Sequence, residues 1–527
     1  MAQDFVSVIT PNTDLTVADH ANAHGPGTST GLDTGDLRRK YNFGDRVSEV
    51  AISQDPFFRF LSKVAKKPVD DPQFKWAEKR PSFHRRYAYV GSAKNNSGTW
   101  VTTSDLGAVK TVGSSLDIRM VTDYKNQGNI QMVYGNSTTK ILLGESGTKP
   151  QFFLPGQVIK VPAAASAAGA VSDYFLARVN TVTDYAIGSG WSTGSGDATL
   201  SAAVNAAGAG ANPDMVELNC TVVRIPITGA NAQYLSVTAD YDQGDDDLSG
   251  ASIAATLEPQ RCYVVGSAYS EGTGYPETWK DQPYSTNIGL TQIWKTSMAM
   301  TNTARATSLK YDANEWARIW KEKLVEHKWD LETSLLFGTQ LEDSTNNINY
   351  TQGAVDYIMN YGNQFSLTIA SKTCDEFLDD MSNFVDPRYN SAQSTIYFCN
   401  TAVYNWLHKL GGYFKNNLEI SDQFRSDMAM TGKKKVFGVD ISTFSTPYGD
   451  INVSRNIHLD GTEIKMIGIN MKNCAWRPLV GNGINRDTSV YVGVQTLENS
   501  GIDRRVDLIL TEGGMEWQMP ESHAIWL

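Results

Sequence analysis

The sequence predicts an α+β fold, in which helices and strands are mixed without a regular alternation. A single long helical pattern covers residues 312–338, and strand-like runs separated by turn residues fill residues 91–265. Beyond residue 338, helical and strand patterns follow one another without a βαβ repeat. These three observations favour a β-rich part beside a mixed part that holds one long helix.

The composition is that of a folded, acidic chain. With 527 residues the chain is long enough for about three domains of ordinary size. A hydrophobic content of 41% with 20% charged residues predicts that most of the chain folds. The net charge of −11 argues against a surface built to grip nucleic acid, because phosphate binding needs a basic face.

The cysteines and the terminal sequence indicate a reducing compartment. The five cysteines are far apart and include no CxxC pair, which favours free thiols over disulfides or a zinc site. They are Cys220, Cys262, Cys374, Cys399 and Cys474. We expect no secretory signal and no membrane span, since the first residues lack a basic and apolar pattern and no apolar run reaches 18 residues.

The first 90 residues predict a polar arm that leads into a short helix and a strand. Residues 1–50 are polar and rich in Gly and Thr, which is typical of a disordered tail. An amphipathic stretch at 47–64 is broken by Pro56, and Phe74 and Trp76 then occupy alternate positions of a predicted strand. Four basic residues follow, Lys79, Arg80, Arg85 and Arg86. On an acidic chain such a patch favours a solvated or subunit-facing surface over nucleic-acid binding.

Residues 91–265 predict an all-β module, either a small barrel or a sandwich. Gly, Ala, Ser, Thr and Val dominate, and turn signals such as NNSG and GSGWSTGSG separate the predicted strands. The acidic run at 240–247 lacks the spacing and the bidentate Glu of an EF-hand, so we expect an exposed turn there.

The pattern at 312–338 has the features of a complete helix: a capping residue, a regular spacing of apolar residues and a terminating glycine. Asp312 is placed to cap the first turn, and Gly338 is placed to end the helix. Its apolar positions recur at spacings of 3, 4 and 7. At about 1.5 Å per residue it would run about 40 Å, which suits either a core helix of a large enzyme or a spine that supports several sheets.

The remaining elements are predicted from shorter patterns. We expect helices at residues 353–361, 372–385 and 401–410, and strands at residues 394–399, 436–445, 450–457 and 463–469. The C-terminal stretch 488–527 predicts two strands around a turn at Gly513 and Gly514.

No catalytic, cofactor-binding or metal-binding residue emerges from the sequence. Of the seven histidines, His20 and His24 lie in the predicted arm, and the other five are isolated, with none four residues from another, which excludes an HExxH zinc helix. MTGKKKVFG at 430–438 lacks the Gly and the Ser/Thr that a phosphate-binding loop requires, and no GxSxG motif occurs. The twelve tryptophans suit a carbohydrate-active enzyme or large subunit interfaces equally well.

The order of motifs is similar to that of a known family. GSAYSEGTGYPETWKDQPYSTNIGLTQIWKTSMAMTNTARAT (266–307) resembles the segment before the spine helix of tailed-phage major capsid proteins with the Hong Kong 97-type (HK97) fold. ISQDPFFRFLSKVAKKPVDDPQFKWAEK resembles an early segment of that family, and KKKVFGVDISTFSTPYGDINVSRNIHL and EGGMEWQMPESHAIW resemble two later ones. The resemblance covers most of residues 47–527, whereas the β module diverges and the first 45 residues match no motif of the family.

The resemblance implies a division of the chain into six parts. They are an N-terminal arm (1–64), an extension or E-loop (65–139), an inserted β-rich domain (140–265), a peripheral domain with the spine helix 312–338 (266–385), an axial domain (386–484) and a return to the peripheral domain (485–527). The implied function is self-assembly into hexamers and pentamers of an icosahedral shell around packaged double-stranded DNA.

The resemblance also implies partners and a location. We expect the chain to associate with itself in the virion after assembly in the host cytoplasm, and with portal, scaffold and minor or cement proteins. No cofactor, no sequence-specific nucleic acid and no membrane is expected. Six residues are expected at subunit interfaces: Phe74, Trp76, Arg85, Arg86, Trp316 and His327. Arg85 and Arg86 would pair with acidic groups of a neighbour.

Two other functions remain open. A β-rich carbohydrate-active enzyme or virion-associated glycan-binding protein would place paired carboxylates and tryptophan platforms in a cleft. A cellular nanocompartment shell with the same fold would enclose a cargo enzyme. The inserted module and the length of the chain favour the viral capsid.

Overall fold

The computed structural model describes residues 55–80, 86–101, 105–122, 149–166, 170–185, 215–227, 229–236, 258–278, 284–307, 315–385, 390, 395–417, 429–436 and 439–527. The predicted tail at 1–50, Arg85, the acidic run at 240–247 and the cap at Asp312 lie outside these ranges.

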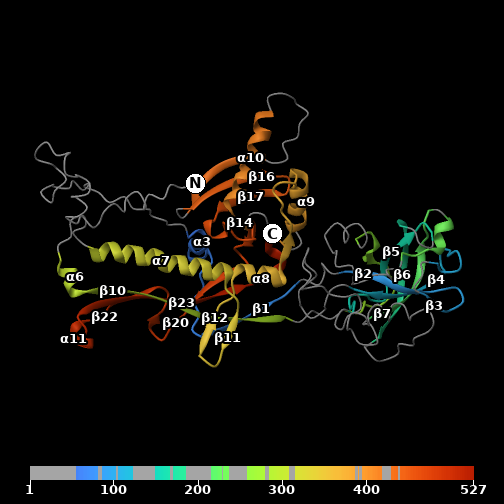
Figure 1. The fold of residues 1–527 in the computed structure, drawn as a ribbon. Coiled ribbons are helices and arrows are strands. Elements are labelled where there is room, and N and C mark those ends of the chain that lie inside the picture. The colour runs from blue at the N-terminus through green and yellow to red at the C-terminus, as the bar shows by residue number, and fades with distance from the viewer. Residues whose placement is uncertain are drawn as a thin grey trace, which may run out of the picture.

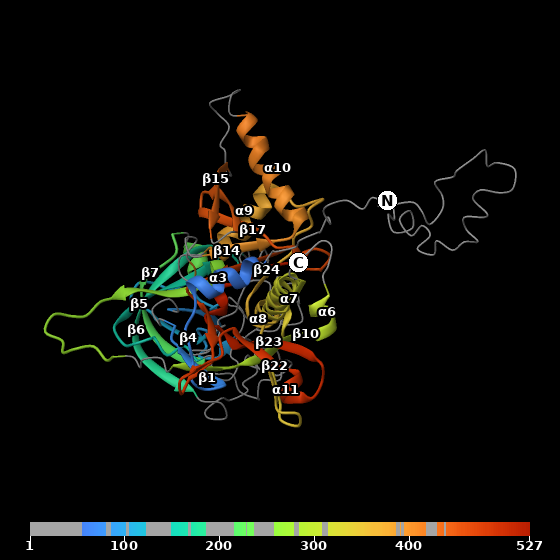
Figure 2. The ribbon, with the colours of Figure 1, turned by 90° about the vertical axis from the view of Figure 1, so that its left-hand side faces the viewer.

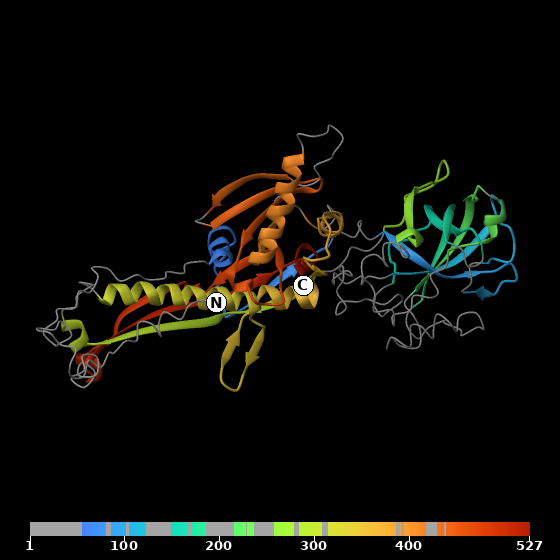
Figure 3. The same ribbon diagram turned by 45° about the horizontal axis from the view of Figure 1, so that its top comes forward.

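A closed β-barrel forms one end of the molecule (Figures 1 and 3). Its strands are β2 (Tyr87–Lys94), β3 (Trp100–Val101), β4 (Ser115–Val121), β5 (Gln157–Ala164), β6 (Val171–Tyr185), β7 (Met215–Arg224) and β8 (Cys262–Ser267). The strand order is β3-β2-β4-β7-β6-β5-β8, and β2 also pairs with β8, so six strands close into a ring. Of the barrel and the sandwich that the sequence left open, the barrel is therefore the one observed.

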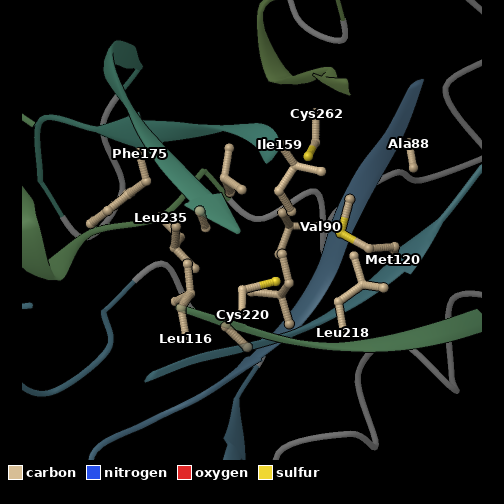
Figure 4. Close-up of a cluster of buried hydrophobic side chains, with 14 of the residues drawn as sticks. Ala88, Val90, Leu116, Met120, Ile159, Phe175, Leu218, Cys220, Leu235 and Cys262 are labelled. Carbon is tan, nitrogen blue, oxygen red and sulfur yellow. The ribbon is translucent and has the colours of Figure 1, made fainter. Parts of the chain in front are cut away.

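The barrel has a hydrophobic core of its own. Inward positions from every strand of the ring meet there, including Ile159, Phe175 and Leu218 (Figure 4). Cys220 and Cys262 are buried among them. Strands of residues 87–121 pair with strands of residues 157–267 in this one sheet, so both stretches contribute to the barrel.

A two-stranded ribbon extends from the rest of the molecule toward the barrel. β1 (Gln73–Glu78) and β9 (Ser285–Leu290) are antiparallel. The alternation predicted for β1 is confirmed, since Phe74, Trp76 and Glu78 are buried and the residues between them are exposed.

The long helix lies against a four-stranded sheet. α7 (Glu315–Phe337) packs on β10 (Gln292–Thr301) and β23 (Arg504–Trp517). The sheet is completed by β19 (Cys474–Pro478) and β22 (Ser489–Gln495), which both pair with β23. Two short helices lie at the far end of this sheet, α6 (Asn302–Ala306) and α11 (Leu497–Ser500) (Figure 1).

A seven-stranded sheet lies on the other side of α7 (Figures 1 and 2). Its order is β13 (Asn363–Phe365), β24 (Ala524–Trp526), β18 (Met466–Asn470), β14 (Thr395–Cys399), β17 (Gly449–Arg455), β16 (Val439–Thr446) and β15 (Ala429–Val436). The helices of this region are α3 (Pro56–Val64), α8 (Ala354–Tyr361), α9 (Cys374–Phe384) and α10 (Thr401–Asn417). The helices predicted at 353–361, 372–385 and 401–410 and the strands predicted between 394 and 469 are found here, while α10 is longer than expected and β15 was not predicted.

Short elements complete the described chain. β11 (Leu341–Asp343) pairs with β12 (Ile348–Tyr350), and β20 (Val480–Gly481) pairs with β21 (Ile484–Asn485). Four single turns of 3-10 helix are η2 (Gly229–Gln233), η4 (Glu258–Gln260), η6 (Ile457–Leu459) and η7 (Pro520–Ser522). None of the helices in this part of the chain has the length and apolarity that a membrane span requires.

The predicted turn at Gly513 and Gly514 is wrong, because β23 runs straight through both glycines. A Cβ atom on Gly513 would lie 2.6 Å from the ring of Trp476, and one on Gly514 would lie 2.3 Å from the carbonyl oxygen of Leu290. The glycines are there because neighbouring groups approach the strand closely, which is the other role that glycine has in strands.

Candidate subunit interfaces

Phe74 and Trp76 are buried inside the subunit. Their ring centroids are 6.0 Å apart. They cover Gly289 on the paired strand β9, where a Cβ atom would lie 2.5 Å from the ring of Phe74. Both rings therefore hold the β1–β9 ribbon together, and their role at a subunit interface stays a prediction.

The basic patch that the sequence suggested is not one surface, because Arg80 is buried. Its guanidinium donates to Glu521 Oε2 at 2.9 Å and to Glu78 Oε2 at 3.2 Å. Trp76 Nε1 also donates to Glu78, at 3.1 Å. Burial raises the pKa of Glu78, and the charge of Arg80 opposes that effect. This cluster joins β1 to η7, so Arg80 stabilises the fold of the subunit.

Arg86 immediately precedes β2 and is half-buried, and its carbonyl accepts a hydrogen bond from the backbone of Val264 at 3.4 Å. Arg85 lies outside the described residues. The pairing of both arginines with a neighbouring subunit stays a prediction.

Trp316 lies in the first turn of α7, at the far end of the four-stranded sheet. The guanidinium groups of Arg505 and Arg305 lie 5.0 Å and 6.0 Å from its ring centroid. The tryptophan is half-buried between strand and helix residues of its own subunit, so its interface role also stays a prediction.

His327 is buried where α7 crosses the four-stranded sheet. Its Nδ1 lies 2.9 Å from Thr296 Oγ1 on β10, and its Nε2 lies 2.8 Å from Thr511 Oγ1 on β23. Burial lowers the pKa of the imidazole, which favours the neutral ring. The side chain is a packing residue that fixes the helix on two strands, and a role toward a neighbour is not tested.

Glu332 is a buried carboxylate that sequence reasoning missed. Oε2 accepts a hydrogen bond from the backbone N–H of Phe58 at 2.7 Å, and Oε1 accepts from the N–H of Phe57 at 3.1 Å and from Asn456 Nδ2 at 2.8 Å. The carboxylate on α7 thus caps the N-terminus of α3, which Asp55 does not cap with its side chain. Burial raises the pKa of Glu332 to about 7. A Glu at this position of an amphipathic helix gives no signal that distinguishes it from a solvated residue.

Two exposed apolar surfaces of the described chain are unexplained by contacts within the subunit. One, which we call the tip surface, lies on β22, on α11 and directly after α11, and comprises Val490, Tyr491, Val492, Val494, Leu497 and Ile502. The other comprises Leu341, Ile348 and Tyr350 on the β11–β12 hairpin. Folded monomers rarely leave such contiguous patches in water, so both surfaces are candidates for contact with another molecule.

The described residues show no arrangement typical of a metal centre, since no group of three or more His, Cys, Asp or Glu is placed to hold an ion. The buried charged groups are instead explained by partners within the chain, as for Glu332 and the cluster of Arg80, Glu78 and Glu521.

Comparison with solved structures finds several phage and encapsulin shells. A structure from Gordonia phage Cozz has 10% sequence identity and a TM-score of 0.32, with 49% of this chain and 77% of that chain covered. The capsid of the cyanophage P-SCSP1u has 10% sequence identity and a TM-score of 0.32, with 49% of this chain and 79% of that chain covered. An encapsulin complex from Synechococcus elongatus has 10% sequence identity and a TM-score of 0.31, with 46% of this chain and 76% of that chain covered.

Comparison of sequences gives the family. A curated protein, the major capsid protein of Pseudomonas phage PaMx41, is 26% identical over 175 residues, which cover 32% of this chain and 41% of that protein. The match therefore spans less than half the length of this curated relative. The model of the SU10 major capsid protein family matches residues 25–526, which is nearly the whole sequence. The chain belongs to the SU10 major capsid protein family.

Proposed function

We propose that many copies of this chain assemble into hexamers and pentamers of an HK97-type icosahedral shell that encloses double-stranded DNA. The observation that carries the proposal is the family match over residues 25–526. The architecture supports it, because the barrel and the body have separate cores and each offers faces to neighbours (Figure 3). Repeated contacts between two different faces close into rings, as a shell requires.

The tip surface supports self-association. Among the described strands, β22 pairs only with β23, so its other edge has no strand partner there. Val490, Val492 and Val494 stand at alternate positions of this strand and all are exposed. An open apolar edge is a hazard for a protein that stays alone and a natural site for association in one that assembles.

We propose the expected division of the subunit, with one adjustment. We assign the arm to residues 1–64, the peripheral domain to 266–385 with the return at 485–527, and the axial domain to 386–484. The barrel takes the place of the inserted domain expected at 140–265. Because its strands begin at Tyr87, the extension expected at 65–139 becomes the β1–β9 ribbon that leads to the barrel.

The proposed role is structural and not enzymatic, and the proposed location is the virion, with assembly in the host cytoplasm. The acidic net charge of −11 suits a lining that does not hold packaged DNA. Portal, scaffold and cement proteins are the further partners that we propose.

A substitution in the tip surface tests the proposal. Val492→Asp places a charge in the contact, and the purified chain should then sediment as small species, whereas the wild type forms shells visible by electron microscopy. Val112→Asp is the control, because Val112 on the barrel and Val492 both have an exposed fraction of 65%. Unchanged shells from Val492→Asp would remove the tip surface from the proposal, and a monomeric wild type that cleaves polysaccharides would overturn the capsid function.

A further inference from the structure

The β11–β12 hairpin projects from the body of the subunit below α7 and α8 (Figure 1). It forms a sheet of two strands that pair with no other described strand. An isolated hairpin of this kind is only marginally stable in water, so an exposed one with apolar side chains calls for a partner.

One face of the hairpin carries three apolar side chains and one carboxylate. Leu341 pairs with Tyr350 and Asp343 pairs with Ile348, and directly paired residues share a face of the ribbon. All three apolar side chains on this face are exposed, Leu341 with a fraction of 55%. The hairpin sequence, residues 339–352, contains Glu342 and Asp343 and no basic residue, so the element is also acidic.

Hydrogen bonds within the chain fix the turn and the base of the hairpin. Asp343 Oδ1 accepts hydrogen bonds from the backbone N–H groups of Thr345 at 3.0 Å and Asn346 at 3.2 Å, which fix the turn. At the base, Gly353 N–H donates to the carbonyl of Gly338 at 2.8 Å. A preorganised element loses little conformational entropy when it binds.

The barrel carries a face of complementary character. Lys160 on β5 pairs in register with Tyr263 on β8 and with Leu176 on β6. Arg178 pairs with Val158, two residues before Lys160 on β5, so it shares the side of Lys160. Val265 lies at the bulge where β8 pairs with β5, and its exposed fraction is 57%. We call Lys160, Leu176, Arg178, Tyr263 and Val265 the cationic barrel face.

The two cations of this face are available to a partner. The ammonium group of Lys160 lies 4.8 Å from the ring centroid of Tyr174 and 5.2 Å from that of Tyr263. Arg178 Nε donates to the carbonyl of Ala268 at 2.8 Å. No carboxylate of the described residues forms an ion pair with either side chain, so both cations can contribute to binding an acidic partner.

We propose that the β11–β12 hairpin of one subunit packs on the cationic barrel face of a second copy of this chain. The two surfaces lie apart within one subunit, with the barrel at one end and the hairpin beneath the body (Figures 1 and 3). The contact therefore joins different faces of two copies, which is the kind of contact that closes a ring. The inference rests on the proposed assembly function and names one of its contacts.

Crosslinking tests the contact directly. Ile348→Cys and Val265→Cys are introduced separately and together into the full chain, and assembled particles are treated with a short bismaleimide. We expect the double variant to give a ladder of covalent multimers. Mixed particles of the two single variants should give a covalent dimer. The single variants alone and the wild type give the background, which includes the half-buried native Cys374.

Charge reversal provides a second readout. Lys160→Glu combined with Arg178→Glu should lower the fraction of chain in particles at least tenfold, while Lys435→Glu, an exposed lysine of β15, should leave it unchanged. Particles that form normally but give no ladder would overturn this inference and leave the capsid function standing. A wild-type chain that forms no particles under any condition would overturn both.

Discussion

Buried polar side chains hold the separate parts of this subunit together. Glu332 ties α7 to the N-terminus of α3, His327 ties α7 to two strands, and Arg80 ties β1 to η7. Each of these side chains bonds to a residue of another element, more than thirty positions away in the sequence. Its role therefore depends on long-range contacts. The resemblance placed His327 at a subunit interface, whereas Glu332 had no local signal that could reveal its role.

The raised pKa of Glu332 predicts a stability that falls as the pH rises. Its folded-state pKa of about 7 lies above the ordinary value of 4.5 for an unfolded chain, so protonation favours folding. This contribution to the free energy of unfolding amounts to at most about 3 kcal/mol. It is fully present below about pH 4.5 and is lost as the pH rises through about 7. Glu332→Gln, which stays neutral, should lack this part of the pH dependence.

The measurement is the free energy of unfolding of the unassembled subunit in urea at a series of pH values between about 4.5 and 8. The difference between wild type and Glu332→Gln removes the contribution of every other titrating group. If both proteins lose stability in parallel over this range, the carboxylate is not the group responsible.

At the level of elements, the sequence predicted what local patterns encode. The helices α7, α8 and α9 were found because a period of 3.6 is readable within one segment. The pairing of β10 with β23, about two hundred residues apart, was not predicted, because strand pairing is a long-range property. The same limit explains Phe74 and Trp76: alternation placed them on one face of β1, but only the pairing with β9 shows that this face is buried.

The close approach of Trp476 to β23 predicts that a side chain at position Gly513 lowers the stability of the fold. Gly513→Ala would place a Cβ atom 2.6 Å from the Trp476 ring, in a core that Trp294 and Phe58 also border. Overpacking of this kind should lower the free energy of unfolding by about 1–3 kcal/mol. Gly266→Ala is the matched control, since Gly266 is also in a strand and no atom lies within 4 Å of the place that its new methyl group would take. Equal urea midpoints for both variants would contradict the close-approach explanation of the glycine pair.

At the scale of the whole molecule, the barrel and the body are two units with separate cores. The barrel core draws only on residues between Tyr87 and Cys262, and the body cores draw on residues before and after that range. The sequence predicted the β module and its approximate extent from turn signals. The turn signals placed the module at residues 91–265, close to the barrel strands, which begin at Tyr87 and end at Ser267. The start at residue 140 came from the resemblance, because the strands at 87–121 were counted there with the extension.

Separate cores predict that the barrel and the body unfold in separate transitions, and the native cysteines report on each. Cys220 and Cys262 are buried in the barrel, and Cys399 and Cys474 are buried in the body. Burial raises the pKa of all four thiols, so they should resist alkylation until their own unit opens. Pulsed alkylation of the unassembled subunit at increasing urea, read by mass spectrometry, should show the two barrel thiols reacting together at one concentration and the two body thiols at another. Simultaneous exposure of all four would mean that the ribbon couples the two cores into one cooperative unit, and that the barrel does not fold independently of the body.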